Sequence, residues 1–212
     1  MVKVKICGIT RSEDAHNALD AGADALGFIF SPSSPRFIEP HVARTIIASL
    51  PPFVTPVGVF VDATRARIME IVAESGVRCL QFHGHESPRD LEGYPLQVYK
   101  AFRVQAGFDP RQIVSYGRTV CMLDTYSKER HGGTGRTFDW SIAREASRLA
   151  RIILSGGIHP DNVADAIRTV RPYAIDVSSG VESAPGVKDP ARIRRLMHEI
   201  RAASTEIERT PT

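Results

Sequence analysis

Residues 152–181 read IILSGGIHPDNVADAIRTVRPYAIDVSSGV. The run 152–155 is short and rich in branched apolar side chains, as is the run 173–177, and both are typical of buried strands. Residues 161–170 between them have the apolar spacing of a helix. Two strands joined by a helix predict a right-handed βαβ unit, in which the strands are parallel.

The same alternation extends over the rest of the chain. Further strands are expected at 2–7, 25–30, 56–61, 79–83, 97–104 and 119–125, and further helices at 12–21, 41–50, 64–75, 140–149 and 190–203. The connections near 88–94 and 109–116 are short and contain proline, so we expect small or irregular helices there. Eight strands in 212 residues predict a single α/β domain, a (β/α)8 TIM barrel over 1–204, followed by a polar C-terminal tail at 205–212. A doubly wound open sheet shows the same alternation and remains the alternative.

The composition excludes several classes of protein. The chain is 42% hydrophobic, and 27 Lys+Arg against 24 Asp+Glu leave a net charge of +3 without a Lys/Arg-dense stretch, which argues against nucleic-acid binding. Cys7, Cys79 and Cys121 lack the spacing of a zinc site or a disulfide framework. No segment has the apolar length of a signal peptide or a membrane span. We therefore expect a cytoplasmic protein with reduced thiols, no metal, and neither a nucleic-acid nor a membrane partner.

Two glycine-bearing loops follow the last two predicted strands. Gly156 and Gly157 follow one strand, and Ser179 and Gly180 follow the next. Glycines let main-chain N–H groups approach an anion, and these barrels commonly hold a phosphate at the loops after strands seven and eight. The loops predict a barrel of the phosphate-binding type. The alternative is that the glycines only turn the chain.

Two other loops hold candidate substrate contacts. The loop 131–137 has three glycines, including Gly133, and is typical of a flexible cover, although a solvent loop without a role has the same composition. The loop 31–36 ends in Arg36, whose planar fork suits a carboxylate. An ordinary Pro/Ser connector is the alternative for this second loop.

Polar side chains collect where strands end, which is the catalytic rim of such a barrel. Lys5 and Cys7 share one face of the first strand, and we expect the cation to lower the pKa of the thiol toward neutrality, giving a base or nucleophile. Asp124 ends the sixth strand and is a candidate acid. Cys7 as a buried apolar group and Asp124 as a helix cap are the alternatives. His83 is either a substrate contact or a hydrogen-bonded rim residue, and Asp176 either orients Lys5 or Cys7 or is a buried polar residue.

Several strings, in order along nearly the whole chain, resemble phosphoribosylanthranilate isomerases. The strings are KICGIT at 5–10, GFIF at 27–30, SPR at 34–36, QFHG at 81–84, LDT at 123–125, GGTG at 132–135, FDW at 138–140, LSGG at 154–157 and DVSSGVE at 176–182. The opening KICG together with the closing DVSSGVE is the most distinctive pair.

The resemblance implies an isomerase of tryptophan biosynthesis. Such an enzyme converts N-(5-phosphoribosyl)anthranilate to 1-(2-carboxyphenylamino)-1-deoxyribulose 5-phosphate by an Amadori rearrangement, without a cofactor. By this resemblance Cys7 is the general base and Asp124 the general acid, while Arg36 holds the anthranilate carboxylate. The phosphate goes to the loops of Gly156, Gly157, Ser179 and Gly180. The sequence does not indicate protein partners.

Three alternative functions share part of this pattern. The histidine-pathway isomerase performs the same rearrangement, but it is expected to use two carboxylates and two phosphate loops, which Cys7 and a single late phosphate site do not match. Indole-glycerol-phosphate synthase should show Lys and Glu at several strand ends, where only Lys5 is found. A phosphosugar-binding subunit without catalysis would keep the loops but lose the pair Cys7 and Asp124.

Overall fold

The computed structural model describes residues 1–105, 107–117, 120–125 and 140–209. Eight parallel strands form a closed barrel in chain order, with β8 paired to β1. They are β1 (Lys3–Cys7), β2 (Ala25–Ile29), β3 (Thr55–Phe60), β4 (Cys79–Phe82), β5 (Gln97–Val104), β6 (Cys121–Thr125), β7 (Ile152–Ser155) and β8 (Ala174–Val177). The predicted TIM barrel is confirmed, and closure by β8 and β1 rules out the open sheet.

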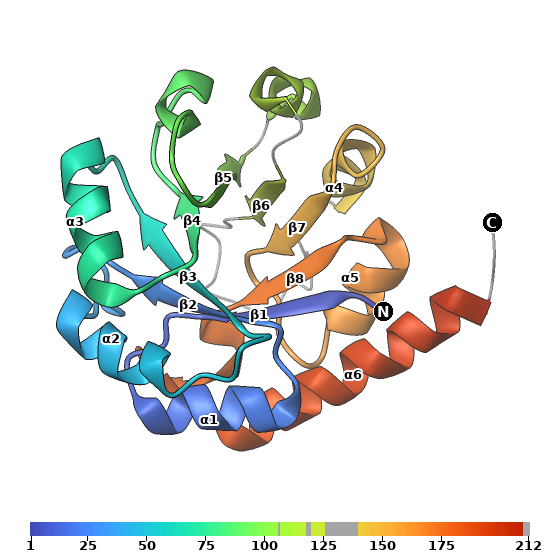
Figure 1. Cartoon of the computed structure of the whole chain (residues 1–212). Helices are drawn as coiled ribbons and strands as arrows, with labels where there is room; N and C mark the ends of the chain where they lie inside the picture. The colour runs from blue at the N-terminus through green and yellow to red at the C-terminus, as the bar shows by residue number, and fades with distance from the viewer. Residues whose placement is uncertain (106, 118–119, 126–139, 210–212) are drawn as a thin grey trace.

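Helices surround the strands (Figure 1). The α-helices are α1 (Ser12–Ala21), α2 (Pro40–Ala48), α3 (Arg65–Ser75), α4 (Trp140–Ala146), α5 (Val163–Val170) and α6 (Pro190–Arg209). The two proline-bearing connections form only short 3-10 helices, η1 (Pro88–Leu91) and η2 (Pro110–Tyr116), as expected. No helix in the described ranges is long and apolar enough to cross a membrane.

The helix ends follow from local chemistry. Gly22 and Gly76 cap α1 and α3 in the left-handed conformation that glycine adopts without strain. The predicted end of the last helix at residue 203 is wrong, because α6 continues to Arg209. Ile207 packs partly against the core, and the N-terminal amine of Met1 pairs with Glu208. The division into a barrel domain over 1–204 and a tail stays a prediction.

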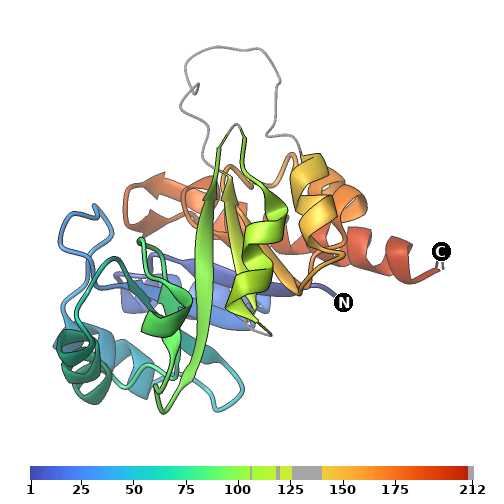
Figure 2. The same cartoon turned by 90° about the horizontal axis from the view of Figure 1, so that it is seen from above.

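Two short elements follow β8 at the rim of the barrel. The 3-10 helix η3 (Ser179–Val181) leads into a hairpin of β9 (Glu182–Ala184) and β10 (Val187–Lys188), which pair antiparallel. Figure 2 shows this part of the chain in orange, beside the barrel strands. The hairpin was missed in the sequence because strands of three and two residues are too short to show alternation.

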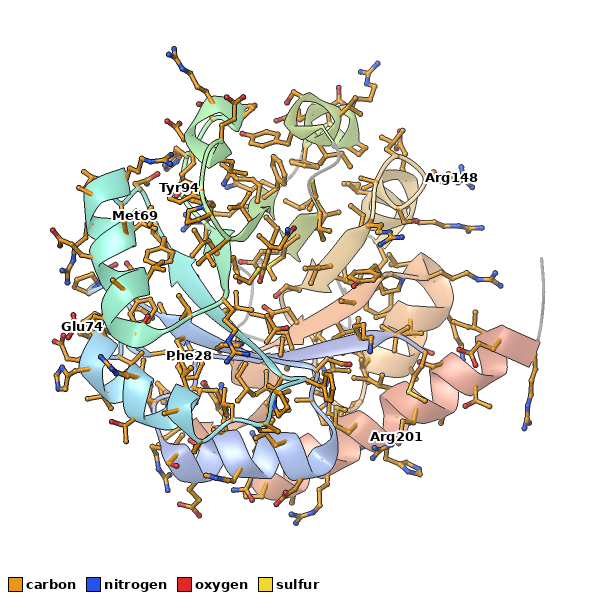
Figure 3. The ribbon with its side chains drawn as sticks, in the orientation of Figure 1. Phe28, Met69, Glu74, Tyr94, Arg148 and Arg201 are labelled. Carbon is orange, nitrogen blue, oxygen red and sulfur yellow. The ribbon has the colours of Figure 1, made fainter. Side chains whose placement is uncertain are left out.

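The core has two layers. The larger cluster lies between strands and helices and includes Phe28, Leu80 and Leu123, all fully buried. A second cluster fills the barrel interior and consists of Val57, Tyr99, Ala101, Met122, Ile153 and Ala174. Figure 3 shows Phe28 close to the strands, whereas Glu74 on α3, Arg201 on α6 and Arg148 just after α4 lie on the outer side of the barrel. The polar residues at the carboxyl ends of the strands lie beyond this interior cluster.

Candidate active site

Cys7 and Lys5 point into the barrel from β1, as their shared face predicts. Both are buried, at 5% and 4% exposure. The neighbouring position on β2 is Gly27, where an added Cβ would lie 2.7 Å from Cys7 Sγ and 3.0 Å from Lys5 Nζ. The absence of a side chain on Gly27 therefore makes the space that the thiol and the ammonium group occupy.

The charge of Lys5 is balanced inside the barrel. Its ammonium donates to Asp176 Oδ1 at 2.7 Å and to Gln81 Oε1 at 3.0 Å. Ser155 donates to the other oxygen of Asp176 at 3.2 Å. Burial opposes the charge on Lys5, but Asp176 together with Cys7 and Tyr99 outweighs it and raises the pKa of Lys5 well above its ordinary value. Asp176 is thus a buried polar residue, at 4% exposure, that pairs with Lys5. Its supporting role in the site stays a prediction.

The environment of Cys7 corrects one expectation. Burial raises the pKa of the Cys7 thiol, although the Lys5 ammonium acts in the opposite direction. Asp176 adds a negative charge nearby that favours the thiol further. The prediction that Lys5 lowers this pKa toward neutrality is therefore wrong for the free protein, because the sequence shows the cation but not the depth of burial or the carboxylate that neutralises it.

Asp124 lies on the same rim and is joined to Lys5 through two side chains. Gln81 Nε2 lies 2.9 Å from His83 Nδ1, and His83 Nε2 lies 3.0 Å from Asp124 Oδ2. The side chains of His83 and Asp124 are 20% and 24% exposed, so both reach the open mouth of the barrel. The structure thus makes His83 a hydrogen-bonded rim residue, and its contact with a substrate stays a prediction.

Arg36 lies at the rim with its guanidinium held by a carboxylate. It donates from Nε to Glu182 Oε1 at 2.8 Å and from Nη2 to Glu182 Oε2 at 2.7 Å. Lys188 donates to Glu182 Oε1 at 2.8 Å and to the carbonyl oxygen of Cys7 at 2.6 Å. Arg36 and Lys188 thus both face the carboxylate of Glu182, although burial lowers the pKa of the Lys188 ammonium.

Burial alone would raise the pKa of Glu182, but hydrogen bonds from Arg36 and Lys188 outweigh it and hold the pKa below its ordinary value. The carboxylate form of Glu182 is therefore stabilised at neutral pH. The pair also ties the β9–β10 hairpin to the end of β1, because Lys188 reaches the backbone of Cys7.

The two late glycine loops lie against each other. Gly156 and Gly157 have φ angles of 81° and 67°. A Cβ on Gly180 would lie 1.9 Å from the carbonyl oxygen of Ile158, so only glycine allows this contact. The short helix η3 begins at Ser179, beside the first loop. Within the described ranges, the N–H groups of Gly157 and Gly180 donate no hydrogen bond.

Three residues of the site were not singled out as site residues in the sequence. Gln81, Glu182 and Lys188 are buried and polar, at 1%, 7% and 3% exposure. Gln81 and Glu182 fall within the family-like strings QFHG and DVSSGVE. Lys188 gives no sequence signal, because its role depends on the undetected hairpin.

Gly133 and the loop 131–137 lie outside the described residues, so the expected cover stays a prediction. Among the residues that the structure describes, no group of three or more His, Cys, Asp or Glu is placed to hold a metal ion.

The closed barrel and the hydrogen bonds that run along its rim from Lys5, on the same strand as Cys7, to Asp124 define the class of the protein: a (β/α)8-barrel enzyme. Comparison with known proteins identifies the family within this class. The family model described as N-(5'phosphoribosyl)anthranilate (PRA) isomerase matches residues 4–199. The chain therefore belongs to the N-(5'-phosphoribosyl)anthranilate isomerase family, and it is an isomerase of tryptophan biosynthesis.

Individual relatives agree with this assignment. The N-(5'-phosphoribosyl)anthranilate isomerase of Pelobacter propionicus is 49% identical over 208 residues, which cover 97% of this chain and 100% of that protein. The crystal structure of the Thermotoga maritima enzyme gives a TM-score of 0.87 at 42% identity, covering 95% of this chain and 100% of that one. A crystal structure of a phosphoribosyl anthranilate isomerase in complex with reduced 1-(o-carboxyphenylamino)-1-deoxyribulose 5-phosphate gives a TM-score of 0.84 at 39% identity, covering 95% of this chain and 100% of that one.

Proposed function

We propose that Asp124 and Cys7 act as the general acid and the general base of the isomerisation. The substrate is N-(5'-phosphoribosyl)anthranilate and the product is 1-(2-carboxyphenylamino)-1-deoxyribulose 5-phosphate. The observation that carries this assignment is the continuous run of polar contacts from the β1 face of Cys7 and Lys5 to Asp124 on β6. Acid and base stand on different strands of one rim, so each can reach a different atom of one substrate.

The reaction begins with a proton from Asp124 to the ring oxygen of the sugar. The bond between that oxygen and C1 then breaks, and the nitrogen lone pair forms an iminium ion. The iminium acidifies the hydrogen on C2, which the Cys7 thiolate removes to give an enolamine. Tautomerisation protonates C1 and releases the hydroxyl proton of C2, which leaves the ketone. No external oxidant or reductant takes part, because C1 is reduced as C2 is oxidised.

The buried thiol suits this order of steps. Burial raises the pKa of Cys7, so the free protein holds it mainly as the thiol. The iminium intermediate places a positive charge near the sulfur, and a positive charge favours the thiolate. The Cys7 thiol then releases its proton to solvent, and the larger fraction of thiolate after ring opening makes Cys7 available to take the C2 hydrogen.

Two anionic groups of the substrate match two parts of the site. Glu182 occupies Nε and one N–H of Nη2 of Arg36, which leaves a second edge of the fork for the anthranilate carboxylate. The phosphate fits the backbone N–H groups of Gly156, Gly157, Ser179 and Gly180, where η3 begins. We propose that Gly133, which lies outside the described residues, also contacts the substrate. The contacts to the carboxylate and the phosphate hold the sugar in position between Asp124 and Cys7, so that both proton transfers can occur.

The proposed setting is the cytoplasm, where a reducing environment keeps Cys7, Cys79 and Cys121 as thiols that form no disulfide. The partner that the site supports is a small phosphosugar.

The direct test is substrate conversion by the purified protein. Phosphoribosylanthranilate is fluorescent, and its signal should fall on addition of the protein at a rate proportional to protein concentration. A signal that stays unchanged would favour a phosphosugar-binding protein without catalysis.

A further inference from the structure

The hydrogen bonds between Lys5 and Asp124 have a fixed direction at every step. An ammonium group only donates, so the Gln81 atom 3.0 Å from Lys5 Nζ is the amide oxygen. The hydroxyl of Tyr99 donates to the same oxygen at 2.8 Å. Two donors on one side of the Gln81 amide therefore fix its NH2 group on the other side.

The orientation of Gln81 determines where the proton of His83 lies. Gln81 Nε2 is 2.9 Å from His83 Nδ1 and donates its other hydrogen toward Met122 Sδ at 3.4 Å. An amide NH2 cannot accept, so His83 Nδ1 must be the unprotonated acceptor. The neutral imidazole then carries its hydrogen on Nε2, which lies 3.0 Å from Asp124 Oδ2. His83 therefore donates to Asp124.

We infer that Gln81 and His83 are positioning residues that confine the acid proton of Asp124 to Oδ1. The inference rests on the proposed role of Asp124 as the general acid. An Nε2–H group cannot accept, so a proton on Oδ2 would face another proton across the hydrogen bond. The carboxylic acid is therefore protonated on Oδ1, which is the atom that faces away from His83. After the proton has left, the His83 N–H stabilises the carboxylate.

The two donors that fix Gln81 keep their protons. Nearby groups, Asp176 foremost, raise the pKa of Lys5 well above its ordinary value against the effect of burial. Burial raises the pKa of the Tyr99 hydroxyl well above its ordinary value. Neither group loses its proton near neutral pH, so both keep donating to Gln81 Oε1 and the direction of the hydrogen bonds from Lys5 to Asp124 does not change.

The tautomer of His83 is directly measurable. In the protein labelled with 15N in its seven histidines, the ring signals that His83→Gln removes should be those of a ring with a protonated Nε2 and an unprotonated Nδ1 at neutral pH. A His83 ring with hydrogen on Nδ1, alone or on both nitrogens, would overturn the inference. This spectrum requires no catalysis, so it does not depend on the role of Asp124.

Gln81→Glu tests the hydrogen bond that Gln81 donates to His83. A carboxylate only accepts, so Nδ1 of His83 should gain a proton and the 15N signature should change. We expect kcat to fall at least about tenfold, because the acid loses its fixed geometry, while KM changes less than about threefold. An unchanged His83 signature with unchanged kcat would contradict the inference.

A matched pair of variants tests the hydrogen bond that His83 donates to Asp124. The amide nitrogen of His83→Gln reaches about as far as Nε2, whereas that of His83→Asn reaches only about as far as Nδ1. The Gln variant should keep at least about ten times more kcat than the Asn variant, at a similar melting temperature. Equal losses in both variants would overturn the positioning role. Near-normal turnover of Asp124→Asn would instead reject the acid assignment itself.

Discussion

Glu182 holds the Arg36 guanidinium through two parallel hydrogen bonds, from Nε at 2.8 Å and from Nη2 at 2.7 Å. The same carboxylate accepts from Lys188, which also binds the backbone of Cys7. One buried acid on the β9–β10 hairpin thus positions both the proposed carboxylate anchor and the end of the strand that carries the base. Glu182 should therefore affect both the affinity for the substrate and the stability of the fold at low pH.

Glu182→Gln should weaken substrate binding. The amide keeps one acceptor but cannot hold both N–H groups of Arg36, so the fork loses its fixed orientation. We expect KM for phosphoribosylanthranilate to rise about tenfold, with a smaller effect on kcat. Glu74→Gln on the exposed face of α3 is the control. Steady-state kinetics in which both variants match the wild type would count against the role of Arg36.

The Glu182 carboxylate should stabilise the fold only above acidic pH. Its pKa in the folded state lies below the ordinary value of 4.5, so its contribution is complete above that value and is lost as the pH falls through the folded pKa. Removal of one partner from a buried ion pair costs on the order of 3 kcal/mol near neutrality. Urea unfolding of wild type and Glu182→Gln should therefore show a difference that shrinks between about pH 6 and about pH 3. A difference that is the same at both pH values would show that the charge of Glu182 is not responsible.

Cys7 should react slowly with iodoacetamide in the free protein. Burial favours the thiol, so the alkylation rate at Cys7 should be low near neutral pH and rise as the pH increases. Lys5→Met removes the cation that favours the thiolate and should slow the reaction further. Peptide mapping separates Cys7 from Cys79 and Cys121, whose pKa values burial raises to about 11. Rapid alkylation of Cys7 at neutral pH would contradict the described environment.

Gly180→Ala should impair phosphate binding. The added methyl group would meet the carbonyl oxygen of Ile158 at 1.9 Å, so the two loops must separate. Substrate KM should rise at least about tenfold, and competitive inhibition by inorganic phosphate should weaken in parallel. If phosphate inhibition is as strong in the variant as in the wild type, the phosphate does not bind between these loops.

The sequence predicted those features that depend on pattern along the chain. Strand alternation places Cys7, Asp124 and Asp176 on the inner face, and the helix ends at Gly22 and Gly76 follow from glycine chemistry. Features that depend on contacts across the barrel were not predictable. The raised pKa of Cys7 follows from burial, which a string of letters does not show.

Contacts between residues far apart in the sequence could not be predicted either. Arg36 and Glu182 are far apart in the chain, and the hairpin that brings Glu182 and Lys188 together was too short to recognise. The string QFHG indicated the place of Gln81 but not its function, because the direction of its amide is fixed by Lys5 from another strand.

The central claim is that a thiol and a carboxyl group, one on β1 and the other on β6, carry the proton transfers. The most direct measurement is kcat of purified Cys7→Ala and Asp124→Asn in the substrate-fluorescence assay, with circular dichroism and melting temperature to verify the fold. Each substitution should lower kcat at least about a hundredfold while the barrel stays intact. Turnover near the wild-type value in either folded variant would contradict the account.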